Sequence, residues 1–117
     1  MVRLSVRVWV WVGLAVSAPA GDRVDFSRDV RPILSDRCFT CHGPDEATRK
    51  VGLRLDTEAG ARQVRGAHIP IVPGDPAASE VMKRVAPERP AMRMPPPYSD
   101  RKPLTEKEIT TLRTWIE

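Results

Sequence analysis

Residues 38–42 read Cys38-Phe39-Thr40-Cys41-His42, and this short stretch decides the fold. On one turn of helix, positions i and i+3 project on the same side, so both thiols can add to the two vinyl groups along one edge of a haem. The imidazole that follows directly is then within reach of the iron, for which it is a strong axial ligand. A C-x-x-C-H run is therefore typical of the covalent attachment of one c-type haem.

Three other interpretations of the two cysteines are open. A structural zinc site requires four ligands, and the further soft or imidazole candidate in the chain is His68. A thioredoxin-like redox pair follows a βαβ pattern, and no buried strand is recognisable upstream. A plain disulfide is the third interpretation. Haem attachment is the one that the rest of the sequence supports.

Residues 1–20 have the pattern of a secretory signal peptide. They combine a basic start with Arg3 and Arg7, an apolar run over residues 8–16, and a small-residue site at Ala18-Pro19-Ala20. The apolar run is shorter than the roughly 20 residues that span a bilayer. We expect export to the periplasm or cell envelope, with residues 21–117 as the mature domain. The alternative is an uncleaved leader that anchors the protein to the membrane.

Length and charge limit the function classes. A chain of 117 residues has room for one domain. The chain has 19 Lys and Arg against 15 Asp and Glu, and two of those arginines belong to the leader. The mature chain is therefore nearly neutral, and nucleic-acid binding has no support from charge. Aromatic residues are few, so a large apolar porphyrin would supply much of the core that a small chain lacks.

A first helix is predicted to lead into the haem motif. Ser27 is expected to cap it. Pro32 lies in its second turn and predicts a later start or a bend. The apolar face of this helix recurs at i, i+3, i+4 and i+8, and consists of Val30, Ile33, Leu34 and Cys38.

The segment after the haem motif is less regular. Residues 51–56 alternate between apolar and polar side chains, so Leu53 and Leu55 are expected to face inward. In a haem protein we expect these two leucines to cover the porphyrin. Thr57 then caps a short helix over residues 59–64, which Gly60 weakens.

Two more helices are expected towards the C-terminus. Asp75-Pro76 predicts a helix start, and the helix is expected to run to about Ala86. Thr105 and Glu108 form a capping box for the last helix. The apolar stripe of that helix is expected to cross the first helix, and it consists of Ile109, Leu112, Trp115 and Ile116.

Residues 87–103 form a second informative stretch, a proline-rich loop that contains a candidate iron ligand. Six of these 17 residues are proline, and loop prolines stiffen the chain. Met94 stands directly before Pro95-Pro96-Pro97 and lies 52 residues after His42. A thioether in a rigid loop suits a distal iron ligand, and Met/His ligation is associated with electron-carrying cytochromes c.

Other residues compete with Met94 for the distal position. Met92 is its near neighbour in the same loop. His68 would give a centre with two histidine ligands. Met82 falls on the apolar face of a predicted helix and is expected to fill the core. An open sixth position is a further alternative.

Six blocks of sequence carry a family resemblance. They are Val24-Asp25-Phe26-Ser27-Arg28-Asp29-Val30-Arg31-Pro32-Ile33-Leu34, Cys38-Phe39-Thr40-Cys41-His42-Gly43-Pro44-Asp45, Gly52-Leu53-Arg54-Leu55-Asp56, Val72-Pro73-Gly74-Asp75-Pro76, Arg93-Met94-Pro95-Pro96-Pro97, and Leu104-Thr105 with Trp115-Ile116. Together they resemble the planctomycete-type cytochrome c domain over about residues 24–117. The family commonly has two glycines where this chain has Val51-Gly52.

The resemblance implies an all-α, small cytochrome c-like fold, in which several short helices and loops wrap around one covalent haem c. It implies that Cys38 and Cys41 are the thioether sites, that His42 is the proximal iron ligand, and that Met94 is the distal ligand. Members of the family are usually the leading domain of longer secreted proteins. The chain is therefore expected to act as a free carrier or as a module of a larger protein.

The leading functional hypothesis is one-electron transfer, with no catalysis by this domain itself. A haem enzyme or gas sensor with an open or displaceable distal ligand is the alternative, and a structural module with haem as its folding core is a third hypothesis. The expected partner is an unidentified redox protein. Basic residues near the predicted distal loop would steer an acidic partner, or would form a solvated rim: Lys83, Arg84, Arg89, Arg93, Arg101 and Lys102.

Overall fold

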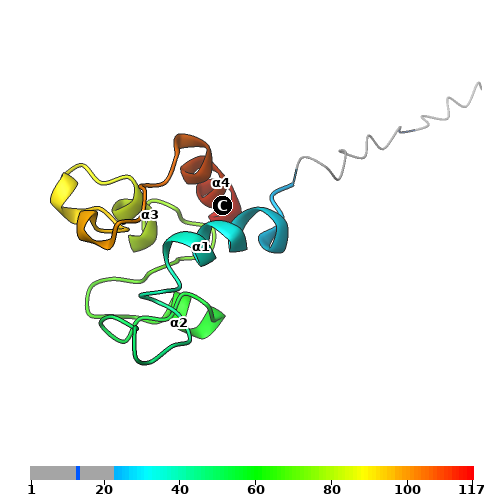
Figure 1. Ribbon diagram of the computed structural model, residues 1–117. Helices are drawn as coiled ribbons and strands as arrows, with labels where there is room; N and C mark the ends of the chain where they lie inside the picture. Colours follow the sequence, from blue (N-terminus) through cyan, green and yellow to red (C-terminus); the bar gives the residue numbers. More distant parts are fainter. Residues whose placement is uncertain (1–12, 14–22) are drawn as a thin grey trace, which may run out of the picture.

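The computed structural model describes Gly13 and residues 23–117. The predicted signal peptide, and with it the boundary of the mature domain, lies outside these residues apart from Gly13. Helices make up the regular structure of the described part (Figure 1): η2 Phe26–Val30, α1 Arg31–Arg37, α2 Glu58–Arg62, α3 Glu80–Val85, η3 Pro90–Met92, η4 Pro97–Ser99 and α4 Glu106–Ile116.

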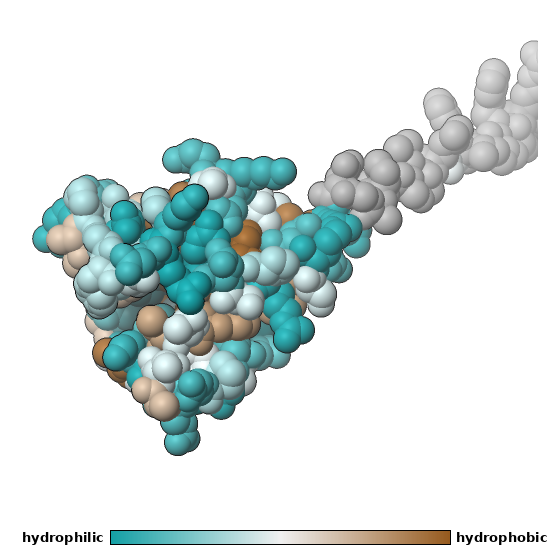
Figure 2. Space-filling view, viewed as in Figure 1, coloured by the Kyte–Doolittle hydropathy of each residue, from teal (hydrophilic) through white to brown (hydrophobic). Residues whose placement is uncertain are grey.

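The all-α fold class is confirmed for the described residues. They contain no strand, and a single antiparallel bridge joins Arg65 to His68. None of their helices has both the length and the apolar character needed to cross a membrane. On the face that Figure 2 shows, brown and pale residues gather in the middle, with teal, hydrophilic residues around them. That the helices wrap around a haem stays a prediction at this point.

The first helix begins with a π-helical turn, η2, and the predicted cap at Ser27 is wrong. Asp25 is the cap: its side chain accepts a hydrogen bond from the backbone N–H of Arg28 at 2.8 Å, and its own N–H donates to Asp29 at 2.9 Å. Ser27 lies inside the turn instead. The α-helical part starts at Arg31 with Pro32 in its first turn, where a missing N–H costs no intrahelical bond. Of the two outcomes predicted from Pro32, a later start or a bend, the later start holds for the α-helical part, which follows η2.

Helix α2 is capped as predicted, by the Thr57 side chain, which accepts from the N–H of Gly60 at 3.1 Å. It ends at Arg62, two residues before the expected end, because Gln63 is already extended. Gly60 has a stronger role than weakening the helix. A Cβ at this position would lie 2.2 Å from the carbonyl oxygen of Arg54, so only glycine allows the two segments to approach.

Helix α3 begins at Glu80 and not at the predicted Pro76. The fully buried Ser79 explains the delay, since its hydroxyl donates to the carbonyl of Asp75 at 2.8 Å and accepts from the N–H of Val72 at 2.9 Å. The N–H of Glu80 then bonds to the carbonyl of Ile69 at 3.0 Å. Contacts with the preceding loop therefore hold residues 75–79 in a turn. Sequence signals at Asp75-Pro76 could not reveal this.

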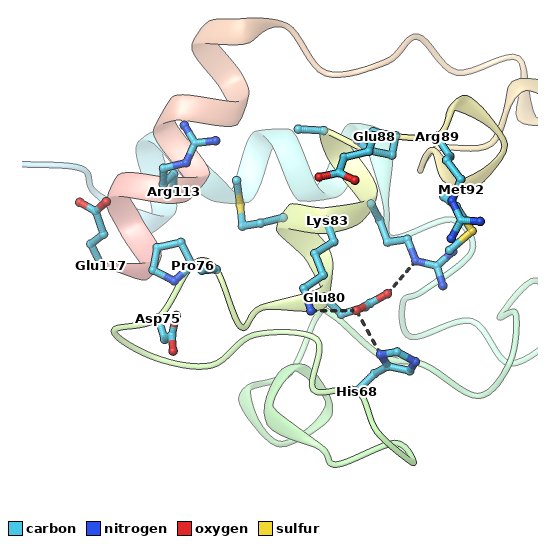
Figure 3. A pocket seen from close by; sticks show the side chains of 15 residues that line it. His68, Asp75, Pro76, Glu80, Lys83, Glu88, Arg89, Met92, Arg113 and Glu117 are labelled. Atoms are coloured by element: carbon cyan, nitrogen blue, oxygen red, sulfur yellow. Dashed lines mark hydrogen bonds and ion pairs between the residues drawn. The ribbon is translucent and has the colours of Figure 1, made fainter.

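Glu80 ties α3 to its surroundings (Figure 3). Its carboxylate lies 2.9 Å from Nε of Arg84, 3.2 Å from Nδ1 of His68 and 3.9 Å from Nζ of Lys83. Partial burial alone would raise the pKa of Glu80, but the hydrogen bond from Arg84 and the charges of His68, Arg84 and Lys83 outweigh it. The pKa of Glu80 therefore lies below its usual value.

Helix α4 has the predicted capping box. The Thr105 side chain accepts from the N–H of Glu108, and the Glu108 carboxylate accepts from the N–H of Thr105. The helix contacts η2 and α3, and the rings of Phe26 and Trp115 lie 5.3 Å apart. The predicted contact between the last helix and the first is thus confirmed.

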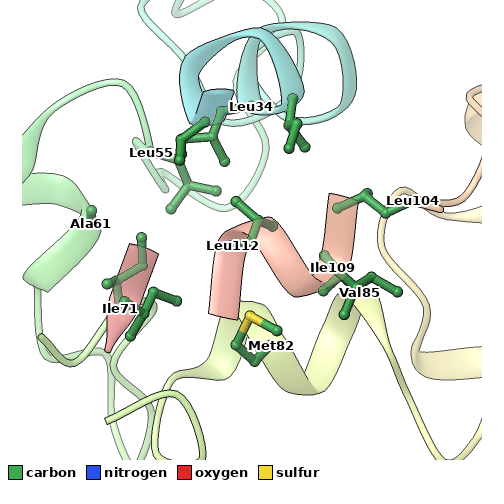
Figure 4. Packing of buried hydrophobic residues seen from close by; sticks show 12 residues of the cluster. Leu34, Leu55, Ala61, Ile71, Met82, Val85, Leu104, Ile109 and Leu112 are labelled. Carbon is green, nitrogen blue, oxygen red and sulfur yellow. The ribbon is translucent and has the colours of Figure 1, made fainter. Parts of the chain in front are cut away.

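The hydrophobic core lies between the first helix, α3 and α4. Leu112 of α4 sits between Leu34 of α1 and Met82 of α3 (Figure 4). Leu112 and Leu34 are each 1% exposed, and Met82 is 7% exposed. The expectation that Met82 fills the core is confirmed.

Replacement of Gly60 by alanine tests the close approach to Arg54. An alanine normally stabilises a helix by about 0.5–1 kcal/mol relative to glycine. Here we expect Gly60→Ala to lower the free energy of unfolding by about 1–3 kcal/mol, as overpacking does, in denaturant titrations of the purified protein. The control is Ala59→Gly at the exposed neighbouring position, which should lose only about 0.5–1 kcal/mol. A more stable Gly60→Ala variant would contradict the steric account.

Glu80→Gln tests the ion-pair cluster on α3. Since the pKa of Glu80 is lowered by folding, its charge stabilises the protein above the unfolded pKa, and this contribution is lost as the pH falls through the folded pKa. We expect the variant to be less stable by roughly 0.5–1 kcal/mol at pH 7 and the difference to vanish in acid. Glu58→Gln, which breaks an exposed pair with Arg62, is the control and should have a smaller effect. A difference that persists at pH 3 would refute the assignment.

Candidate functional site

A mostly apolar cavity of about 540 Å³ opens beside the C-x-x-C-H turn. Its walls come from the end of α1, from the two loops that flank α2, from α3 and from the loop that follows η3. All six residues that the sequence predicts for the site line this cavity: Cys38, Cys41, His42, Leu53, Leu55 and Met94. The structure therefore brings together segments that lie more than fifty residues apart in the chain.

The two cysteines lie in a hydrogen-bonded turn that directly follows α1. The N–H of Cys38 donates to the carbonyl of Leu34 at 2.8 Å, and the N–H of His42 donates to the carbonyl of Cys38 at 2.8 Å. Both thiols are free and half-buried. Burial raises the pKa of the Cys38 thiol to about 11, so this thiol is protonated at neutral pH. Two thiols on one helical turn at the wall of an apolar cavity fit the attachment of a haem edge.

His42 has the properties of a metal ligand. Its Nδ1 is buried and has no hydrogen-bond partner among the described residues. Burial lowers the pKa of His42, as does the charge of Arg65, while the backbone of Lys50 acts in the opposite direction without satisfying Nδ1. Buried imidazole nitrogens normally have a partner, and neutral imidazole is the form that binds a metal. The residues present thus fit a haem whose iron takes this imidazole.

The backbone around His42 is tightly held. The N–H of Leu55 donates to the carbonyl of His42 at 2.8 Å. Arg49 donates to the carbonyls of Gly43 at 2.8 Å and Pro44 at 3.0 Å. A Cβ at Gly43 would lie 2.1 Å from the carbonyl oxygen of Phe39, so this position requires glycine.

Met94 lies on the wall of the same cavity as His42. Its N–H donates to the carbonyl of Arg84 at 2.9 Å, and the next residue, Pro95, is buried. The peptide bond between Met94 and Pro95 is cis. Met92 lines a different, more open cavity of about 800 Å³ that Figure 3 shows.

His68, the other distal candidate, lines both cavities, and its Nδ1 faces Glu80. Glu80 and Arg84 also line both, so this ion-pair cluster forms the wall that the two cavities share. Of Met94, Met92 and Met82, Met94 is the methionine that lines the cavity of His42. His68 lines it too, with its Nδ1 paired to Glu80.

Sequence reasoning missed a pair of arginines that close one side of the cavity. Arg101 donates to the carbonyl of Asp36 at 2.5 Å and to the hydroxyl of Thr40 at 2.8 Å. Arg37 donates in return to the carbonyl of Lys102 at 3.0 Å. The two arginines fasten the loop after Met94 to the segment that carries the cysteines. No local pattern signals contacts across more than sixty residues of sequence.

Comparison with known families agrees with this site. A sequence model for the family described as planctomycete cytochrome C matches residues 38–98. The match is shorter than the resemblance over residues 24–117, yet it includes the C-x-x-C-H turn and Met94. Searches among curated proteins and among solved structures gave no significant match. Because the matched region spans more than half of the chain and contains the C-x-x-C-H turn, the protein belongs to the planctomycete cytochrome C family of c-type cytochromes.

Proposed function

We propose that this protein transfers single electrons through one covalently bound haem c. Cys38 and Cys41 form the thioether bonds, His42 is the proximal ligand, and Met94 is the distal ligand. The observation that carries the proposal is that one apolar cavity is lined by all four of these residues. When bound, the haem supplies a one-electron couple between ferrous and ferric iron.

The chain's own residues hold and shield that centre. Leu53 and Leu55 line the cavity and exclude water from it. His42 is fixed through its backbone and Met94 through its bond to the carbonyl of Arg84. A weak thioether ligand stays bound only when its loop is held in place, and the bonds of Arg101 to Asp36 and Thr40 provide this support. A rigid site of this kind suits a carrier, because little rearrangement accompanies a change of charge.

Location and partners follow from the same proposal. Covalent haem attachment takes place outside the cytoplasm, and the leader pattern of residues 1–20 indicates export to the periplasm or cell envelope. We propose a redox protein as the partner, with the domain acting as a free carrier or as the electron-transfer module of a larger protein. Arg93, Arg101 and Lys102 lie on the loop next to Met94 and would favour an acidic docking surface.

The first test is haem attachment. We expect the full chain, produced in a host with cytochrome c assembly machinery, to be red, to carry the mass of one haem, and to give a haemochrome spectrum of the c type. The double variant Cys38→Ser/Cys41→Ser is the control and should have the mass of the bare polypeptide after export. A colourless unmodified protein at the bare mass would refute the proposed function.

The second test concerns the distal ligand. Methionine bound to ferric haem iron gives a weak far-red absorption, which we expect in the unmodified protein. Met94→Ala should lose this band and have a lower reduction potential, because methionine ligation raises the potential and axial ligands set haem potentials over roughly 0.8 V.

Met92→Ala is the matched control for this test and should keep both the band and the potential. If Met94→Ala kept the band, another residue would be the ligand. If the unmodified protein lacked the band and bound carbon monoxide rapidly, the open-site alternative would replace the carrier.

A further inference from the structure

Four arginines line the cavity that holds the predicted site residues. Two of them already have carboxylate partners. Arg37 forms an ion pair with Asp36 and lies 3.4 Å from Glu108. Nε of Arg84 lies 2.9 Å from the Glu80 carboxylate. The positive charges of these two arginines are therefore compensated within the protein.

The third arginine, Arg101, forms hydrogen bonds next to and within the C-x-x-C-H turn, residues 38–42, which we call the cysteine turn. Its two terminal nitrogens bond to the carbonyl of Asp36 and to the hydroxyl of Thr40, which stands between the two cysteines. Arg101 therefore belongs to the part of the cavity where the thioether bonds would form. Its donors already serve to join the two loops.

Arg65 differs from Arg37 and Arg84 in having no carboxylate partner among the described residues, and from Arg101 in making one side-chain hydrogen bond and not two. Its side chain donates to the carbonyl of Val51 and forms no ion pair within the described residues. It is half-buried, and its charge acts on the imidazole of His42, whose pKa it lowers. The hydrogen bond to Val51 is exposed, so the guanidinium is accessible from outside the protein, and its charge has no carboxylate partner among the described residues.

The backbone holds Arg65 in a defined place. Its N–H donates to the carbonyl of His68 at 2.7 Å, and the N–H of His68 donates to the carbonyl of Arg65 at 3.1 Å. Gly66 inside this turn has a φ of 63°, a conformation that favours glycine. Both ends of the turn line the cavity, and His68 at the far end is already paired with Glu80. Arg65 is thus a preorganised cation that lacks an anion.

The missing anion matches the chemistry of the cofactor. Haem carries two propionate groups on the pair of pyrrole rings that lack the vinyl groups. With the vinyl-bearing half bonded to Cys38 and Cys41, the propionates belong to the part of the cavity away from the cysteine turn. Arg65 lies outside the C-x-x-C-H turn and reaches the cavity next to Val51, to whose carbonyl it donates. Arginine pairs with carboxylates through two parallel hydrogen bonds.

We propose that Arg65 binds a propionate of the haem and keeps it ionised inside the cavity. This inference rests on the proposed function, since it requires a covalently bound haem. Arg65 exchanges the carbonyl of Val51 for the propionate or shares its donors between the two. Its positive charge offsets the propionate's negative charge near the iron and thereby favours the ferrous state.

The experiment compares haem-loaded unmodified protein with Arg65→Gln, Arg65→Lys and a control, Arg31→Gln. Arg31 is exposed on α1 and does not line the cavity. Haemochrome spectra and intact masses first establish that each sample carries covalent haem. Infrared redox difference spectra, with ¹³C in the propionate carboxyls, then report the state of the propionates, and the reduction potential is measured at pH 8.

We expect Arg65→Gln to shift one propionate band and to lower the reduction potential, and Arg65→Lys to give a smaller shift of both. Arg31→Gln should match the unmodified protein. Propionate bands and a potential that are the same in Arg65→Gln as in Arg31→Gln would overturn the inference while leaving haem attachment intact. Absence of covalent haem from the unmodified protein would instead overturn the proposed function on which the inference rests.

A crystal structure of the haem-loaded unmodified protein decides the matter if Arg65→Gln does not mature. The expected result is a guanidinium nitrogen of Arg65 within hydrogen-bond distance of a propionate oxygen. The inference fails if both propionates find other partners and Arg65 bonds to Val51 alone.

Discussion

The packing of the cysteine turn against residues 49–55 is the interaction on which the rest of the structure depends. The N–H of Lys50 donates to the carbonyl of Cys41 at 2.6 Å, and that of Leu55 donates to the carbonyl of His42 at 2.8 Å. Gly43 permits the tight turn of residues 39–43 itself, because a side chain there would meet the backbone of Phe39. The segment that carries the two thiols and the imidazole is therefore held at one wall of the cavity by these backbone bonds together with the side chains of Arg49 and Arg101. A cofactor that bonds to all three meets a preorganised site.

Different interactions stabilise the core of this small domain and the loops around its cavity. The buried apolar residues gather around Leu112, between the first helix and α3, whereas the loops around the cavity depend on hydrogen bonds. Each such bond contributes only about 1 kcal/mol. Arg37 and Arg101 form two bonds between the same two segments, from Arg37 to the carbonyl of Lys102 and from Arg101 to the carbonyl of Asp36, and together these bonds hold the segments more firmly than either bond alone. An apolar porphyrin in a cavity of about 540 Å³ would add the burial that these loops lack.

Local signals in the sequence predicted two helix caps and failed at Ser27, where Asp25 is the cap. Thr57 and Thr105 cap their helices as expected, because capping depends on a side chain and on backbone groups two or three residues away. The six residues that the sequence predicts for the site line one cavity, while their roles towards a haem stay predictions. What it could not predict depends on distant segments: Ser79 delays α3 by bonding to the preceding loop, and Gly60 is required by a carbonyl of Arg54. Charged residues such as Arg101 resemble surface residues until their partners are known.

A continuous set of contacts joins the loop that contains Met94 to the turn formed by residues 65–68. The N–H of Met94 bonds to the carbonyl of Arg84, and the side chain of Arg84 pairs with Glu80. Glu80 in turn pairs with His68, whose backbone closes the turn that begins at Arg65. The residue expected to bind the iron and the residue proposed to bind a propionate are thus fixed to one another through α3. Because His68 is a link in this set, its pairing with Glu80 favours a structural role for it, which agrees with our proposal that Met94 is the distal ligand.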